Sequence, residues 1–114
     1  MIPSQMLKGT LEGSILAVIS QRETYGYEIS QALKQHGFGD ISEGTIYPLL
    51  LRLEKNALIT ATYRDTGRGP KRKYYTLTPA GQAELAQFIL SFQALEAAVH
   101  HLLQYSGKDE TYYE

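Results

Sequence analysis

The clearest chemical signal in the sequence is a group of four cations within six residues, Arg68, Lys71, Arg72 and Lys73. No acid lies among them, and the sequence from Asp65 to Pro70 is rich in turn-forming residues. Lysine and arginine side chains grouped in this way bind backbone phosphates of nucleic acids, with an affinity that falls as salt rises. The segment therefore predicts a cationic turn that contacts a polyanion.

A second group of candidate binding residues lies on an amphipathic stretch just before this turn. Apolar residues at helical spacing predict one buried face, made of Ile46, Leu49, Leu50 and Leu53. The other face then exposes residues that suit contact with a nucleic acid, because they offer close backbone approach, hydroxyl groups or positive charge. These residues are Gly44, Thr45, Tyr47, Pro48, Arg52 and Lys55, together with Ser42 at the start of the stretch.

Ser42 is a good N-cap for this helix, and Ile41 and Ile46 occupy the two positions of a hydrophobic staple. Pro48 lies beyond the first turn and removes one helical hydrogen bond. We therefore expect a helix that is bent or that starts late.

The remaining elements can be read from periodicity and turn residues. Further helices are expected over about residues 4–21, 25–36 and 79–105, the last with Thr78 as N-cap, and strands over 58–63 and 73–77. Tyr74 and Tyr75 are adjacent on a strand, so one faces the core and the other does not. Three helices followed by a hairpin is the order of a winged helix-turn-helix, in which the third helix enters the major groove and the hairpin lies along the backbone.

The expected fold is thus α+β and mostly α. Residues 1–78 form the DNA-binding unit, residues 79–105 form a helix for dimerisation, and residues 106–114 form a tail that we expect to be disordered.

The charges are unevenly distributed along the chain, although the net charge is only −1. Residues 41–83 carry seven basic and three acidic groups, a net +4, whereas residues 84–114 carry a net −4. The positive segment coincides with the predicted helix and hairpin, which is what a protein presenting one face to DNA requires. The alternative is a solvated charge gradient without function.

Composition limits the class of protein. A chain of 114 residues with 43% hydrophobic residues suits one globular domain. It has no cysteine, which excludes disulfides and cysteine-ligated zinc, and no run approaches the ~18 apolar residues of a membrane helix. We expect a cytoplasmic protein without a membrane partner.

Catalytic or metal chemistry is not indicated. The sequence has no nucleophile motif, phosphate-binding loop or paired carboxylates. Glu96 and His100 lie four residues apart on one helix face and can bind zinc, but two ligands do not complete a tetrahedral site. We expect no enzyme, metal or cofactor.

Several motifs in a fixed order resemble those of the PadR-type transcriptional regulators, specifically the short members with one C-terminal helix. The motifs are Tyr25-Gly26-Tyr27-Glu28-Ile29, Gly44-Thr45-Ile46-Tyr47-Pro48 with Arg52-Leu53-Glu54, and Gly69-Pro70-Lys71-Arg72-Lys73-Tyr74-Tyr75. The resemblance implies a homodimeric repressor of a palindromic operator in double-stranded DNA, released in many members by a small molecule, and it adds Tyr25 to the DNA-contacting residues. One departure is Ala57, where the family usually has glycine, at the exit from the third helix.

The C-terminal helix predicts an association surface. Apolar residues recur at spacings of three and four over more than two heptads, an arrangement we call the apolar seam: Leu85, Phe88, Phe92, Leu95, Val99 and Leu102. A helix of about 27 residues is about 40 Å long, whereas a globule of 77 residues has a radius of gyration of about 11 Å. Its own domain therefore cannot cover the helix, and a second subunit is expected; packing within one subunit is the alternative.

The resemblance also implies an effector site at the dimer interface, because short members that sense planar hydrophobic drugs line a cavity there with the first and last helices. By position, the lining residues would be Met6, Gly9, Gly13, Ala17, Phe88, Phe92 and Glu96. Gly9, Gly13 and Ala17 recur every four residues and would leave a groove along the first helix. The alternative is that Phe88 and Phe92 fill this groove and leave no cavity. A further alternative for the whole protein is a winged-helix module used for protein association.

Overall fold

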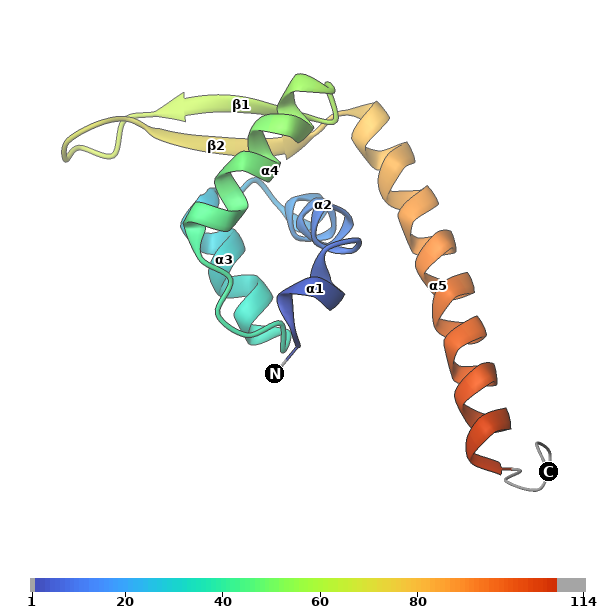
Figure 1. The fold of residues 1–114 in the computed structure, drawn as a ribbon. Coiled ribbons are helices and arrows are strands. Elements are labelled where there is room, and N and C mark those ends of the chain that lie inside the picture. The colour runs from blue at the N-terminus through green and yellow to red at the C-terminus, as the bar shows by residue number, and fades with distance from the viewer. Residues whose placement is uncertain (1, 109–114) are drawn as a thin grey trace.

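The computed structural model describes residues 2–108, as a helical body with one hairpin and a projecting C-terminal helix (Figure 1). The elements are α1 (Ser4–Leu7), α2 (Leu11–Gln21), α3 (Gly26–Gln35), α4 (Glu43–Lys55), β1 (Ile59–Arg64), β2 (Arg72–Leu77) and α5 (Pro79–Lys108). The predicted fold class is confirmed. Helices α2, α3 and α4 form the body. The hairpin projects from one side of it and α5 from the other (Figure 1).

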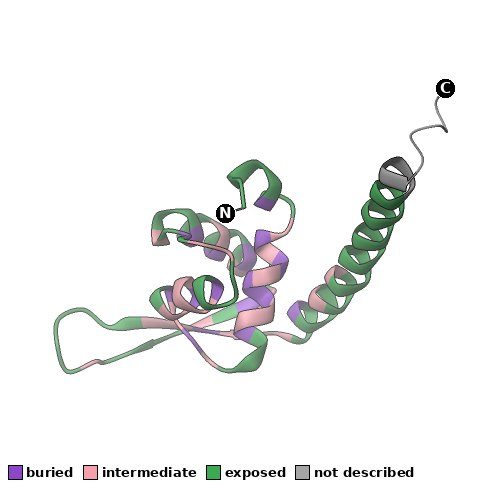
Figure 2. Cartoon of the chain, turned by 90° about the horizontal axis from the view of Figure 1, so that it is seen from below, coloured by how far each residue is buried: buried purple, intermediate pink, exposed green. Residues whose placement is uncertain are grey.

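The core lies where α2, α3 and α4 meet the hairpin. Its most buried side chains include Ile15, Ile29, Ile46, Leu50 and Ile59, each exposed by 1% or less. Burying one such side chain stabilises the fold by about 1.5–3 kcal/mol. In Figure 2 the buried residues line the inner sides of these helices, whereas α5 is almost wholly exposed beyond its first turns.

The first predicted helix is in fact two, because the chain breaks at Lys8, Gly9 and Thr10. Glycine is a poor helix former, and Thr10 has a non-helical φ of −120° and ψ of −10°. Its Oγ1 donates to the Leu7 carbonyl at 3.1 Å, and its backbone carbonyl accepts from Ser14 N at 3.0 Å. Periodicity missed the break because Leu7 and Leu11 are both buried on either side of it.

Helix α4 begins at Glu43 and runs through Pro48 without interruption. Of the two expected effects of Pro48, the late start is therefore wrong, and the bend stays a prediction. Ser42 caps the helix, because its Oγ accepts from Thr45 N at 3.2 Å. Pro48 is exposed and lies opposite the buried side chains of the helix. The carbonyl that lacks a partner, that of Gly44, therefore faces solvent, where water can satisfy it.

The hairpin is tied to the helical body through Tyr75. Strands β1 and β2 pair from Ile59 with Leu77 to Arg64 with Arg72. Tyr75 also exchanges two backbone hydrogen bonds with Thr24, at 2.7 and 3.2 Å, just before α3. Tyr75 is consequently the core residue of the tyrosine pair, at 2% exposure, and the hairpin is fixed relative to α3.

The start of α5 is fixed to the end of α4. Thr78 Oγ1 accepts from Gly81 N at 3.0 Å and donates to the Ala57 carbonyl at 2.7 Å. The helix then continues to Lys108, past the predicted end at Tyr105, so Ser106 and Gly107 do not stop it. Of the tail expected to be disordered, residues 109–114 lie outside the described residues.

Candidate nucleic-acid interface

The outer face of α4 contains every residue that the sequence assigned to it. Each of the six predicted contact residues on this helix is exposed: Gly44, Thr45, Tyr47, Pro48, Arg52 and Lys55. The capping residue Ser42 is exposed as well. A Cβ added at Gly44 would meet only Ser42 Oγ, at 3.7 Å, so packing within the chain does not require glycine there. The missing side chain instead flattens the outer surface of the helix.

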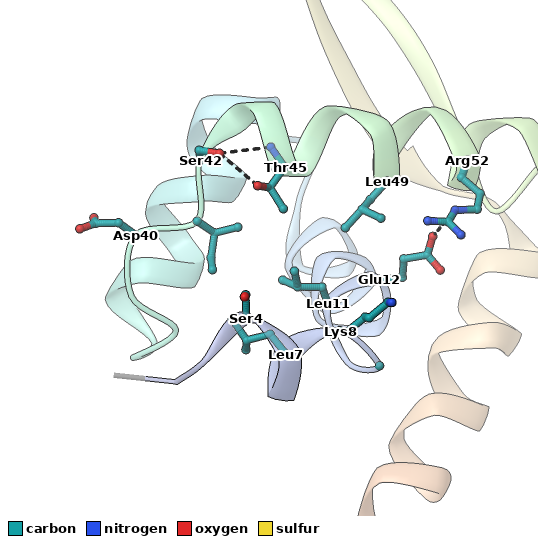
Figure 3. Close-up of a pocket in the computed structure, with 12 residues that line it drawn as sticks. Ser4, Leu7, Lys8, Leu11, Glu12, Asp40, Ser42, Thr45, Leu49 and Arg52 are labelled. Carbon is teal, nitrogen blue, oxygen red and sulfur yellow. Dashed lines mark hydrogen bonds and ion pairs between the residues drawn. The ribbon is translucent and has the colours of Figure 1, made fainter.

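Arg52 is held on one side of this face by an ion pair. Its Nε lies 2.9 Å from Glu12 Oε2, at the start of α2 (Figure 3). The pair closes one end of a cleft of about 520 Å³ between α4 and the turn that joins α1 to α2. The Arg52 side chain is 61% exposed, so Glu12 positions the cation without hiding it.

The connection between β1 and β2 is a turn stabilised by local hydrogen bonds. Gly67 N donates to Asp65 Oδ1 at 2.9 Å, and Thr66 Oγ1 donates to the Arg68 carbonyl at 2.8 Å. Gly67 and Gly69 have φ values of 76° and 63°, which glycine adopts without strain. The turn therefore has a defined shape, and it presents Arg68 and Lys71 to solvent.

Arg72 lies on an aromatic surface that joins the hairpin to α3. Its guanidinium carbon is 4.2 Å from the centre of the Tyr25 ring, and Tyr25 in turn contacts Tyr74 with ring centres 5.2 Å apart. A hydrogen bond with Tyr74 raises the pKa of the exposed Arg72 above its ordinary value. The predicted contacts Tyr25 and Arg72 are thus neighbours, and Arg72 keeps an open side toward solvent.

Lys73 is the cation of the hairpin that is most engaged within the protein. Its Nζ lies 2.9 Å from Glu54 Oε1 on α4, and its side chain is only 25% exposed. The hydrogen bond with Glu54 raises the pKa of Lys73 above 10.5 despite partial burial. Lys73 therefore joins the hairpin to α4, and a DNA contact by it stays a prediction.

A cleft of about 470 Å³ separates the hairpin from α3 and α4. Its body side is formed by Tyr25, Tyr27 and Tyr47, and its hairpin side by Arg68, Lys71 and Arg72. A Cβ at Gly26 would come 2.9 Å from the Tyr47 hydroxyl, so glycine is needed to seat that tyrosine. Burial and then the hydrogen bond to Glu43, at 3.2 Å, raise the pKa of Tyr47.

Tyr47 therefore stays a hydrogen-bond donor at neutral pH, inside a cleft lined by cations. Tyr27, at 52% exposure, lies in the same cleft and was not predicted. Its signal in the sequence is its spacing of two residues from Tyr25, which places both rings at the start of α3, where they stack at 6.4 Å.

Comparison with known proteins agrees with this geometry. The sequence matches the model of the transcriptional regulator PadR-like family over residues 15–87, more than half of the chain. The chain belongs to the PadR-like family. It is 32% identical over 93 residues to the negative transcriptional regulator PadR of Bacillus subtilis, a match that covers 78% of this chain and 50% of that protein.

Solved structures of PadR-like proteins have the same fold. A PadR-like transcriptional regulator from Bacillus cereus is 53% identical, with a TM-score of 0.78 over 88% of this chain and 97% of that one. Bacillus subtilis PadR in complex with operator DNA is 30% identical, with a TM-score of 0.65 over 70% of this chain and 46% of that one. Members of the PadR-like family are transcriptional regulators, which confirms that the chain is not an enzyme.

The apolar seam of this PadR-like chain lies mainly in solvent. Leu85 and Phe88 are half-buried against the body, whereas the other four residues are exposed by 41% to 63%: Phe92, Leu95, Val99 and Leu102. Helix α5 spans about 45 Å, and the molecule extends over 68 × 28 × 20 Å. The body therefore covers only the first turns of α5.

The predicted effector residues of the PadR-like chain are only partly brought together. Met6, Phe88 and Phe92 line a cavity of about 320 Å³, along with Ile2, Leu7, Thr10, Ser14 and Phe38. Ala17 lines a neighbouring cleft of about 150 Å³, which also includes Phe88. A Cβ at Gly13 would overlap the Phe88 ring, so that ring fills the space the glycine leaves.

Gly9 and Glu96 line neither of these two spaces. Gly9, at the break between α1 and α2, instead lines the cleft of about 520 Å³ beside α4, and a Cβ there would meet nothing within 4 Å. Phe38, which follows the end of α3, is a lining residue that helical spacing could not identify.

Two further findings concern metals and membranes. Among residues 2–108, no three histidine, cysteine, aspartate or glutamate side chains gather closely enough to hold a metal ion. Within the same range, no helix combines the length and the apolarity needed to cross a bilayer.

Proposed function

We propose that the chain is a homodimeric repressor that binds a palindromic operator. Two α4 helices enter successive major grooves about 34–36 Å apart, and each hairpin contacts the flanking backbone. The observation that carries this proposal is the cationic cleft between α4 and the hairpin, where three tyrosines and four cations line one space. The operator complex of a PadR relative supports it.

The dimer half of the proposal rests on the apolar seam. Four large side chains of the seam are exposed by 41% to 63%, and an apolar stripe of this length is what a second α5 packs against in a coiled-coil arrangement. Dimerisation also sets the spacing of the two α4 helices. One subunit alone would contact half of the operator.

Selection of bound duplexes from random DNA tests the proposal. A palindromic consensus supports both DNA binding and twofold symmetry. Replacing Lys71 by alanine should weaken binding to all duplexes and lower the slope of log affinity against log salt by about 0.9. Lys34→Ala is the matched control, because it removes the same charge from α3, where Lys34 pairs with Asp40 at 3.1 Å.

If the wild type binds no DNA, or if Lys71→Ala has the same salt dependence as the control, the hairpin does not bind phosphate. A wild type that binds no DNA would favour the alternative, a winged helix that serves protein association.

We also propose that a small hydrophobic or aromatic effector relieves repression from the cavity of about 320 Å³. Aromatic rings of Phe38, Phe88 and Phe92 line it, and α2 and α5 meet there. Planar aromatic cations should raise the melting temperature of the wild type and raise that of Phe92→Ala less. Leu90→Ala is the control, because Leu90 lies on α5 away from the apolar seam. No thermal shift with the wild type would contradict the effector site.

A further inference from the structure

The outermost residues of α4 form one stripe along the helix, which we call the outer stripe: Gly44, Pro48, Leu51 and Lys55. They follow one another at spacings of four, three and four, and all are exposed. Leu51 is the largest apolar residue among them, with 60% of its surface exposed. Sequence reasoning overlooked it, because it falls outside the buried set of the same helix.

The position of Leu51 on the helix surface is fixed by its neighbours on either side. On one flank, Glu54 pairs with Lys73 of the hairpin and Tyr47 lines the cleft next to the hairpin. On the other flank, Arg52 pairs with Glu12 of α2. Leu51 therefore lies between the two groups of polar residues and faces outward from the domain. A single exposed leucine needs no explanation in general, but this one lies in the middle of the face that would enter the groove.

The chemistry of the outer stripe limits what it can recognise. Gly44 has no side chain, and Pro48 and Leu51 have no polar side-chain atom, so no side-chain hydrogen bond to a base edge is available from these three positions. The thymine methyl is the apolar group that base edges present in the major groove. Burying a leucine against a methyl group is favourable, whereas burying it against a polar base edge leaves that edge without a partner.

We propose that Leu51 reads a thymine methyl group in each half of the operator. The polar residues on either flank then contact phosphates or neighbouring bases, while Gly44 and Pro48 allow the backbone of α4 to approach closely. This inference rests on the proposed DNA binding, and it assigns Leu51 as a determinant of sequence specificity rather than of general affinity.

The experiment uses the operator obtained by selection with the full chain. Each thymine of one half-site, together with its symmetry mate, is replaced by deoxyuridine, which removes only the methyl group. At one position the wild type should lose about fourfold in affinity per methyl, or about fifteenfold for the pair. Leu51→Ala should bind the two duplexes equally at that position.

Leu90→Ala is the control, since Leu90 has the same residue type and a similar exposure, 61%, on α5. It should discriminate thymine from uracil as the wild type does. Alanine is a good helix former, so the exposed Leu51→Ala change keeps α4 intact.

The inference is overturned if the wild type tolerates every uracil replacement, or if Leu51→Ala retains the full wild-type loss at each of them. A wild type that selects no duplex at all refutes the proposed DNA binding itself, which the selection step reveals before any replacement is made.

Discussion

Helices α4 and α5 both expose large apolar side chains, but for different reasons. In α4 the apolar face formed by Ile46, Leu50 and Leu53 is buried within the subunit, at 2% exposure or less, and Leu51 is left on the polar side. In α5 the apolar face itself is exposed, since Phe92, Leu95 and Val99 are 41% to 55% accessible. An exposed apolar side chain on a helix must therefore be interpreted together with the apolar side chains that the same helix buries. In the proposed function, α4 therefore presents its polar face to DNA, whereas the exposed apolar face of α5 packs against a partner helix.

The largest expected effect comes from placing a charge on the exposed apolar face of α5. Phe92→Asp should weaken dimerisation by at least about 3 kcal/mol, because an unpaired carboxylate would be buried between two helices. Sedimentation equilibrium should then show monomers at concentrations where the wild type is dimeric. The outer face of α4 would be unchanged in each monomer, so the substitution tests the apolar face of α5 alone.

The control is Leu90→Asp, which places the same charge on α5 away from the apolar seam. It should leave the dimer intact. A Phe92→Asp protein that remains dimeric would show that α5 associates through a different face.

The two regions meet at Gly81, which therefore tests whether they act as one unit. A Cβ there would overlap the backbone carbonyl oxygen of Leu58, which cannot rotate away as a side chain could. Gly81→Ala should lower the free energy of unfolding by about 1–3 kcal/mol, through the strain of overpacking. Urea titration measures this loss. An unchanged midpoint would mean that α5 can shift on the body freely, and that its position does not constrain α4.

Gly44→Ala is the opposite case, since this glycine touches nothing that a methyl group would displace. The substitution should stabilise α4 by about 0.5–1 kcal/mol, because alanine loses less backbone entropy in a helix. It should nevertheless weaken operator binding, since the added methyl holds the helix away from the groove. Thermal unfolding and DNA titration of the same variant measure the two effects. Weaker stability together with unchanged affinity would show that Gly44 serves the fold and not the groove.

The sequence predicted the buried and exposed faces of α4 better than the surroundings of α5. Cap, staple and apolar spacing act within a few residues, so Ser42, Ile46 and the exposed set of α4 could be placed from local pattern alone. The break at Gly9 and the lining of the cavity by Phe38 depend on packing between distant segments, which spacing does not encode. The partners of Arg52 and Lys73, Glu12 and Glu54, were missed for the same reason, because ion pairs between elements have no periodic signal.

An effect on stability as small as that of Gly44→Ala is expected at Ala57, where α4 ends beside the start of α5. Ala57 has a φ of 60°, and the hydrogen bonds from Ala57 N to Glu54 O and from Leu58 N to Leu53 O, both 3.0 Å, form a Schellman motif. The same motif closes α3 at Gly37, with a φ of 96°. The glycine usual at position 57 is thus absent, but the geometry it serves is retained.

Replacing Ala57 by glycine should raise the free energy of unfolding by about 0.5–1 kcal/mol, since the relief of about 1–2 kcal/mol in left-handed strain exceeds the added unfolded-state entropy. Gly37→Ala is the reciprocal control. A Cβ at Gly37 meets nothing within 4 Å. Gly37→Ala should therefore lower the free energy of unfolding by a similar amount, through backbone strain alone. Urea titrations of both variants should shift in opposite directions. If Ala57→Gly destabilises the protein, the methyl group of Ala57 packs usefully at the junction, and the end of α4 depends on α5 rather than on its own capping motif.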